Sequence, residues 1–192
     1  MILIPRARRA CTLLLAIPMT VAAQTPVQPT VAALEAGLSG LWAGTLSYRD
    51  YQTDKMVDLP MRAEYRALDD GATVINFATF DDGPKAGAVI VTTVELFNLK
   101  LGMVDNVAFR RGRPEDKEVD KVSLAAFTDD LHWTLQFDHD GLDGKVKAHI
   151  RSIETRDGNA LTIEEEVVPI IGAKKDWKTR NITKLTRIEP KS

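Results

Sequence analysis

The sequence predicts an all-β protein, an antiparallel up-and-down β-barrel of about 8–10 strands that follows a short N-terminal helix. From residue 41 onward, apolar and polar residues alternate with a period of two, in runs of about ten residues. Clusters of Asp, Gly, Asn and Pro separate these runs at regular intervals, for example at 69–71, 81–84 and 156–159. One apolar and one polar face over many strands is typical of a closed soluble barrel.

Residues 1–23 have the composition of a secretory signal peptide. Arg6, Arg8 and Arg9 form a basic start, residues 11–19 are mostly apolar, and small residues at 21–23 suit a signal peptidase. The alternative for this segment is a buried N-terminal helix. The signal-peptide interpretation predicts a periplasmic or secreted bacterial protein.

Composition narrows the classes of partner. The formal net charge is −2, which disfavours nucleic acid because phosphate binding needs a basic surface. The one cysteine, Cys11, lies inside the predicted signal peptide, so stability must come from a packed core and not from disulfides. No later apolar run has the length of a transmembrane helix, and we expect a protein that does not span a membrane.

The elements follow in order along the chain. Residues 24–37 form an N-terminal segment in which Thr30 caps a short helix over 31–35. Residues 38–192 form a single barrel domain, with the segment 98–118 the hardest to assign. Strands are predicted near 40–51, 56–68, 72–81, 88–97, 103–110, 119–128, 131–138, 145–154, 160–168 and 177–188.

In three predicted hairpins, one choice of strand register places apolar residues opposite apolar residues on one face and polar residues opposite polar residues on the other. Antiparallel partners have a constant sum of residue numbers, and partners share a face of the sheet. The predicted pairs are Trp42 with Tyr65, Trp133 with Ala148, and Ile150 with Ile163, with a turn over 138–144. On the outer face, the same registers place His149 beside His132 and Glu164.

The segment Gly40-Leu41-Trp42 opens the first strand directly after the short helix. It resembles the G-x-W signature of lipocalins and the wider calycin group. The longer pattern over 40–51 and 81–84 also resembles uncharacterised secreted bacterial proteins of lipocalin-like type. The resemblance implies that Trp42 closes one barrel end, that a basic residue of the last strand, Arg187, packs over it, and that the barrel holds a ligand pocket.

Several predicted inward residues are candidate ligand contacts. Tyr48, Asp50 and Glu165 are polar residues at inward positions, where burial without a partner is costly. The alternative for Tyr48 and Asp50 is a satisfied structural network near Thr179 and Asn181. For Glu165 the alternative is a bulge that turns it outward. The apolar wall of the pocket is predicted to include Tyr65, Phe77 and Trp133.

Two further groups have the residue types of metal sites. His132, His149 and Glu164 form one predicted row, whose alternative is a solvated surface row. Asp138, Asp140 and Asp143 have the carboxylate density of a calcium loop, although Asp and Gly are also ordinary hairpin-turn residues. The sequence indicates no cofactor and carries no nucleophile, P-loop or dinucleotide motif.

The leading hypothesis is a secreted or periplasmic barrel that binds a small apolar or amphipathic molecule. The alternative is a protein-interaction module whose barrel is filled with side chains and holds no ligand. An enzyme is the least favoured class, because it depends only on Glu165 and Asp50.

Overall fold

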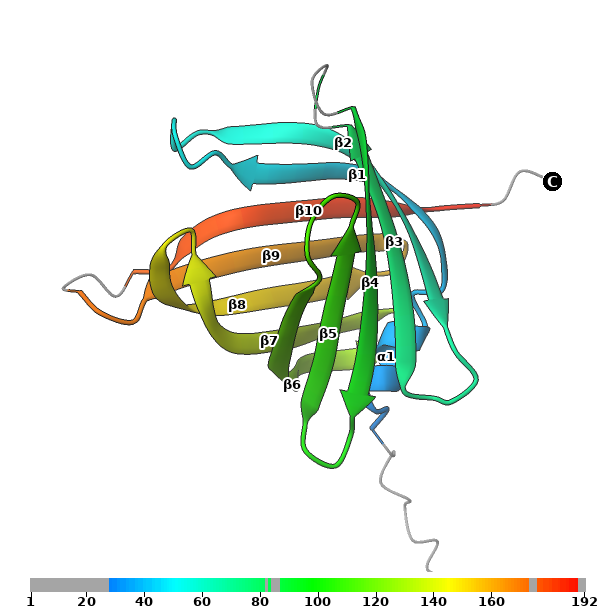
Figure 1. Cartoon of the computed structure of the whole chain (residues 1–192). Coiled ribbons are helices and arrows are strands. Elements are labelled where there is room, and N and C mark those ends of the chain that lie inside the picture. The colour runs from blue at the N-terminus through cyan, green and yellow to red at the C-terminus, as the bar shows by residue number, and fades with distance from the viewer. Residues whose placement is uncertain (1–27, 82, 84–86, 173–175, 190–192) are drawn as a thin grey trace, which may run out of the picture.

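The computed structural model describes residues 28–81, 83, 87–172 and 176–189, and Figure 1 shows its ten strands and one helix. The predicted signal peptide lies outside the described residues. No helix among the described residues is long and apolar enough to cross a membrane. The elements are α1 (Val31–Ala36), β1 (Gly40–Arg49), β2 (Met56–Ala67), β3 (Thr73–Asp81), β4 (Ala88–Asn98), β5 (Met103–Arg110), β6 (Asp116–Asp129), β7 (His132–Asp143), β8 (Val146–Asp157), β9 (Ala160–Pro169) and β10 (Lys178–Ile188).

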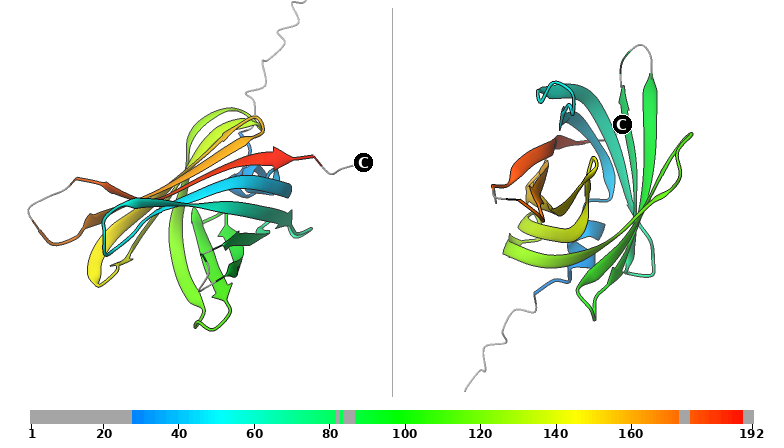
Figure 2. Two further views of the ribbon diagram at one scale, coloured as in Figure 1. Left: turned by 90° about the horizontal axis from the view of Figure 1, so that it is seen from above. Right: turned by 60° about the vertical axis from the view of Figure 1, so that its left-hand side comes forward.

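The strands form a closed antiparallel barrel in which every strand pairs with its neighbours in sequence and β1 pairs with β10. The predicted fold class is therefore confirmed. Figures 1 and 2 show that β3, β4 and β5 cross β8, β9 and β10 at a steep angle, so the barrel is strongly twisted. Residues 98–118, the hardest segment to assign from the sequence, contain β5 and the first residues of β6. β6 begins at Asp116, three residues earlier than predicted.

The observed registers keep the predicted faces but not the predicted partners. Trp42 pairs with Ala63 and not with Tyr65, a shift of two residues. Trp42 and Tyr65 still lie on one face, with ring centroids 6.5 Å apart and an interplanar angle of 78°. A shift by an even number of residues preserves the alternation, which is why the sequence pattern could not detect it.

The hairpin between β7 and β8 turns later than predicted. Asp143 pairs with Val146, and the turn consists of Gly144, at φ +64°, and Lys145. Trp133 therefore pairs with Arg156 and not with Ala148. The Asp- and Gly-rich segment 138–143 was predicted as a turn because of its composition, but its alternating side chains continue the strand.

One end of the barrel is closed by α1 and the segment after it. Leu34, Leu38 and Trp42 are buried there, and Trp42 Nε1 donates a hydrogen bond to the Leu38 carbonyl at 2.8 Å. The Arg187 guanidinium lies 4.7 Å from the Trp42 ring centroid and donates to the carbonyls of Gly37 and Ser39, each at 2.8 Å. The apolar core extends from this end through Tyr65, Val74, Phe97, Val104, Val122, Trp133, Leu135, Phe137, Leu161 and Leu185.

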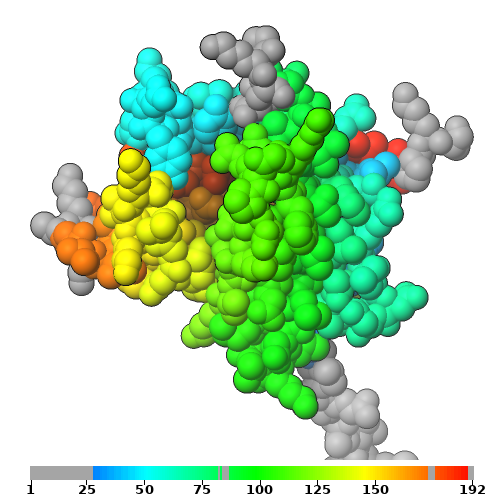
Figure 3. Space-filling model, in the orientation of Figure 1, coloured from blue at the N-terminus to red at the C-terminus, as the bar shows by residue number. Residues whose placement is uncertain are grey.

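The side of the barrel is open between β6 and β7. Their pairing ends at Lys121 with Asp138; beyond it, residues 116–120 pair with β5 and residues 139–143 pair with β8. A cleft of about 670 Å³ lies between the two diverging segments. Figure 3 shows the hollow between the yellow and green surfaces, with the orange-red strands at its back.

Candidate functional site

A polar cavity occupies the barrel interior next to the apolar core. Its deep part has a volume of about 160 Å³, and an adjoining space of about 310 Å³ shares several of its lining residues. Five acidic residues and one histidine line the deep part, and no lysine or arginine of the described chain lines it. These residues are Glu95, Glu118, Asp120, Glu154, Glu165 and His139.

Three glutamates, Glu35 of α1, Glu95 of β4 and Glu154 of β8, interact beside this cavity. Glu35 of α1 is 1% exposed and Glu154 of β8 is 7% exposed, and each carboxyl affects the pKa of the other. Burial, reinforced by the charge of Glu95, raises the pKa of Glu154 to about 8. Burial likewise raises the pKa of Glu95 to about 7 and that of Glu35 well above its usual range. Because like charges disfavour each other in a buried site, the raised pKa values keep these neighbouring carboxyls from all ionising together.

Two asparagines and a tyrosine continue the polar lining. Tyr65 of β2 faces Asn76 of β3 across the ladder, and burial raises the pKa of the Tyr65 hydroxyl well above 10. The side-chain oxygens of Asn76 and Asn106 are buried and accept no hydrogen bond from the described residues, and the same holds for Oε1 of Glu35 and of Glu154. The cavity therefore presents several hydrogen-bond acceptors without donors.

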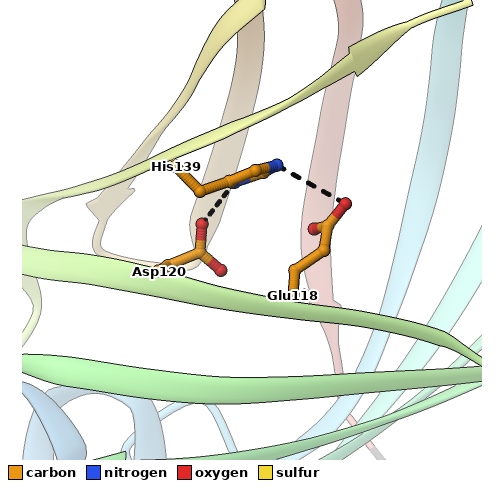
Figure 4. Close-up of side chains that lie close together, drawn as sticks. All are labelled: Glu118, Asp120 and His139. Atoms are coloured by element: carbon orange, nitrogen blue, oxygen red, sulfur yellow. Dashed lines mark hydrogen bonds and ion pairs between the residues drawn. The ribbon is translucent and has the colours of Figure 1, made fainter. Parts of the chain in front are cut away.

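A chain of polar contacts runs from the cavity to the lateral cleft. Asn106 Nδ2 donates to Asp120 at 2.9 Å, and Asp120 Oδ1 lies 2.6 Å from His139 Nδ1. His139 Nε2 is 3.5 Å from Glu118 Oε1, as Figure 4 shows. The hydrogen bond to Asp120, together with the nearby Glu118 carboxylate, raises the pKa of His139 to about 10 because both carboxylates stabilise the imidazolium.

Of the predicted ligand contacts, Glu165 and Tyr65 line the cavity. Glu165 points inward from β9 and accepts a hydrogen bond from Asn181 Nδ2 at 2.9 Å. No bulge turns Glu165 outward; the irregularity in this pair of strands lies in β10 between Thr179 and Asn181. Burial raises the pKa of the Glu165 carboxyl.

The other predicted contacts lie elsewhere. Tyr48 pairs with Asn181 across the β1–β10 seam but is not among the residues that line the cavity. Asp50 accepts hydrogen bonds from the amides of Gln52 and Thr53, so it closes the turn after β1. Trp133 is a core residue, buried near the closed end.

Phe77 lies on the outer face of β3. It pairs with Glu64, while its neighbour Asn76 pairs with the inward Tyr65. The Arg66 guanidinium lies 5.2 Å from the Phe77 ring centroid. Phe77 was predicted as a pocket residue because apolar residues of a strand usually face the core. Here the apolar side chain lies on the outer face instead.

The two metal groups predicted from the sequence do not form. His132 contacts Asp129 and Asp157, His149 contacts Asp140, and Glu164 accepts a hydrogen bond from Thr179, so the predicted row is dispersed. The cause is the register, which differs from the predicted one by several residues. Asp138 and Asp140 lie on the outer face of β7, Asp143 lies on the opposite face, and each has its own partner: Gln136, His149, and the pair Arg180 and Tyr51.

Most residues of the polar interior were not predicted from the sequence. The residues missed lie at inward positions of their strands: Glu95, Glu118, Asp120, His139 and Glu154. The available signal was their spacing of an even number of residues from buried apolar residues, as for Asp120 with Val122 and His139 with Phe137. Charged residues in strands are usually exposed, so the alternation pattern alone does not identify these residues as inward-facing.

Comparison with known proteins extends this description only at the level of the fold. No family model and no curated protein matches the chain. Among solved structures, the chain is similar to the crystal structure of Rv2717c from M. tuberculosis, with 16% sequence identity and a TM-score of 0.56. The match covers 84% of this chain and 100% of that chain. At this identity the likeness shows a shared barrel fold, and a fold does not define a function.

Proposed function

We propose that this protein binds a small organic cation, an amphipathic amine, inside its barrel. We also propose that it does so in the periplasm or outside the cell, as the N-terminal sequence indicates. A lipocalin-like role as a small-molecule carrier accords with the Gly40-Leu41-Trp42 segment and with Arg187 over Trp42. The leading hypothesis included apolar and amphipathic ligands, and a purely apolar one is less suitable because the deep cavity is lined mainly by polar groups.

The observation that carries the proposal is the set of buried acceptors without donors. Buried polar groups in proteins are nearly always hydrogen-bonded, and leaving one unpaired costs about 1–3 kcal/mol. Here Glu154, Asn76 and Asn106 each have such an oxygen, and all three residues line one cavity. An ammonium group supplies up to three N–H donors and a positive charge, and therefore satisfies both the acceptors and the excess of carboxylates.

The apolar part of the ligand has its own contact surface. Phe137 and Ile163 line the same deep cavity, and Tyr65 contributes its ring. Pockets that combine an apolar wall with a few convergent polar groups are typical of small-molecule sites. A short alkyl chain attached to the ammonium group fits this combination.

Isothermal titration calorimetry with three matched probes tests the proposal. n-Butylammonium should bind, whereas n-butanol and n-butyrate, which have similar shapes but different charges, should not. Glu154→Gln should weaken butylammonium binding by about tenfold or more, the loss of one charge-assisted hydrogen bond. Glu64→Gln, on the outer face of β2, is the matched control and should leave the affinity unchanged. Equal binding of butyrate, or equal binding by the Glu154 variant, contradicts the proposal.

A second candidate function, binding of a protein partner, is favoured by one observation. The outer face of β3, β4 and β5 exposes Ile90, Leu96 and Phe109 and also carries Phe77. Exposed apolar clusters of this kind often mark interaction surfaces. If butylammonium does not bind and Phe109→Ser abolishes a concentration-dependent self-association in sedimentation experiments, the interaction module becomes the better account.

A further inference from the structure

Glu118, Asp120 and His139 come together where β6 and β7 separate. The group supplies one nitrogen and two carboxylate oxygens that all lie within 4.8 Å of one another. Glu118 and Asp120 are alternate residues of β6 and point inward, and His139 faces them from β7 (Figure 4). Glu118 and His139 line both the interior cavity and the lateral cleft. Asp120 lines the cavity but not the cleft.

The ring of His139 is held in one orientation. Asp120 Oδ1 lies 2.6 Å from Nδ1, and Asp120 is itself 6% exposed and fixed through Oδ2 by Asn106. Nδ1 therefore carries a proton that it donates to Asp120. Nε2 is left facing Glu118 at 3.5 Å and has no hydrogen-bond partner among the described residues.

A carboxylate that accepts a hydrogen bond from the far nitrogen of a histidine is the usual support of a metal-binding imidazole, because it fixes the ring and increases its basicity. We infer that the lateral cleft contains a divalent transition-metal site in which His139 Nε2 and the Glu118 carboxylate are the ligands and Asp120 is the orienting residue. The metal displaces the proton on Nε2, as every histidine ligand requires.

The donor set indicates the class of metal. Imidazole nitrogen with carboxylate oxygen suits Zn²⁺, Co²⁺ or Ni²⁺, whereas Mg²⁺ and Ca²⁺ prefer oxygen ligands alone. The cleft leaves the remaining coordination positions open to water or to an anionic group of a bound molecule. Glu118 is 43% exposed and His139 is 13% exposed, so the site is reachable from solvent and still shielded on its inner side.

The other two histidines provide internal comparisons. His132 lies 2.7 Å from Asp129 and 3.5 Å from Asp157, nearly the same distances as around His139, but its side chain is 47% exposed. His149 and Asp140 form an exposed pair on the outer face. Neither lines the interior cavity, and neither belongs to a three-ligand group among the described residues.

Titration of the purified chain with CoCl₂ and ZnCl₂ tests the inference. Co²⁺ should produce visible d–d absorption that saturates at one ion per chain, and Zn²⁺ should displace it. His139→Gln and Glu118→Gln should each weaken binding at least about tenfold, and Asp120→Asn about 10–100-fold, the usual effect of losing an orienting carboxylate. His132→Gln, the matched control, and Glu154→Gln, in the cation cavity, should both retain the affinity.

A nitrogen-15 NMR spectrum of the histidine rings provides a second readout. Zn²⁺ should shift the Nε2 resonance of His139 and leave those of His132 and His149 in place. Glu118 is largely exposed, so its variant tests the site even if the His139 variant fails to fold. Absence of binding at millimolar metal, or equal loss in the His132 variant, overturns the inference.

Discussion

Glu154 is a carboxyl that the fold keeps out of water and gives no basic partner. It interacts with Glu35, which is buried, and with Glu95, which is half-buried, and its Oε1 accepts no hydrogen bond from the described residues. Removing an ionised carboxylate from water is costly without a cation, so in the free protein Glu154 retains its proton near neutral pH. A ligand cation would allow it to ionise.

We expect Glu154→Gln to remove part of the pH dependence of stability. The folded-state pKa of about 8 lies above the usual 4.5, so this carboxyl favours folding fully below pH 4.5, and its contribution is lost as pH rises through 8. Above pH 8 the variant should therefore be more stable than the parent, by up to about 4–5 kcal/mol, the equivalent of this shift. Urea unfolding at several pH values measures this. If the variant and the parent lose stability in parallel from pH 5 to 8, Glu154 does not titrate in this range.

Gly40→Ala should destabilise the closed end of the barrel by about 1–3 kcal/mol. Gly40 has a φ of +131°, and a Cβ built there lies 2.9 Å from Arg187 Nη1. Gly71→Ala is the matched control, because Gly71 also has a positive φ, +69°, but has nothing within 4 Å of its Cβ. Guanidinium unfolding should show a larger loss at residue 40 than at residue 71; equal losses would mean that contact with Arg187 is unimportant.

At the scale of elements, α1 is held in place by its contacts with the barrel. A helix of six residues is too short to be stable alone, so packing and capping must fix it. Thr30 Oγ1 accepts a hydrogen bond from the Ala33 amide at its start, and Arg156 and Arg187 donate to the Gly37 carbonyl at its end. Leu34 and Glu35 thereby become the floor of the barrel interior.

Trp42→Ala should cost about 3–5 kcal/mol, the range for truncating a large buried aromatic residue. Trp42 joins α1 to β1 through its hydrogen bond to Leu38, and it contacts both Tyr65 and Arg187. Trp177→Ala is the control, since Trp177 is partly exposed and stacks only at the surface with Arg151. An unfolding midpoint that is unchanged in the Trp42 variant would show that this end contributes little to stability.

The sequence predicted the strands well because alternation and turn residues are local signals. It predicted the partners less well, because alternation defines a face and not a register: Trp42 was expected opposite Tyr65 and pairs with Ala63. The site was recovered only in part for the same reason. Glu165 was identified by its inward position, whereas His139 lay in a segment read as a turn, and the separation of β6 from β7 has no signature in either strand alone.

As a whole molecule, the barrel is closed at one end by α1 and opens sideways between β6 and β7. Apolar residues pack against the helix, and carboxyls line the interior cavity, with Glu35 of the helix beside them. The cleft beside Glu118 and His139 leads to this acidic interior. Such an arrangement attracts cations toward the opening and repels anions.

Affinity for n-butylammonium should increase with pH. Glu95 and Glu154 have pKa values of about 7 and about 8, and only their ionised forms attract the cation, so binding should tighten as pH rises through this range. Calorimetry between pH 6 and 9 measures the change. The Glu154→Gln variant serves as the control, and its affinity should depend less on pH. A flat profile in the parent protein would contradict the assigned role of these glutamates.

A carbon-13 NMR titration of the glutamate side-chain carboxyls, with and without saturating n-butylammonium, tests most directly whether the barrel interior binds a cation. We expect the free protein to have two glutamates that titrate near pH 7 and pH 8, of which the one near pH 8 is absent in Glu154→Gln. We also expect the ligand to lower the higher of these pKa values by about one unit or more, equivalent to about 1.4 kcal/mol of preferential binding to the ionised form. If all glutamates titrate near 4.5, or if the ligand leaves the raised pKa unchanged, the interior is not a cation site.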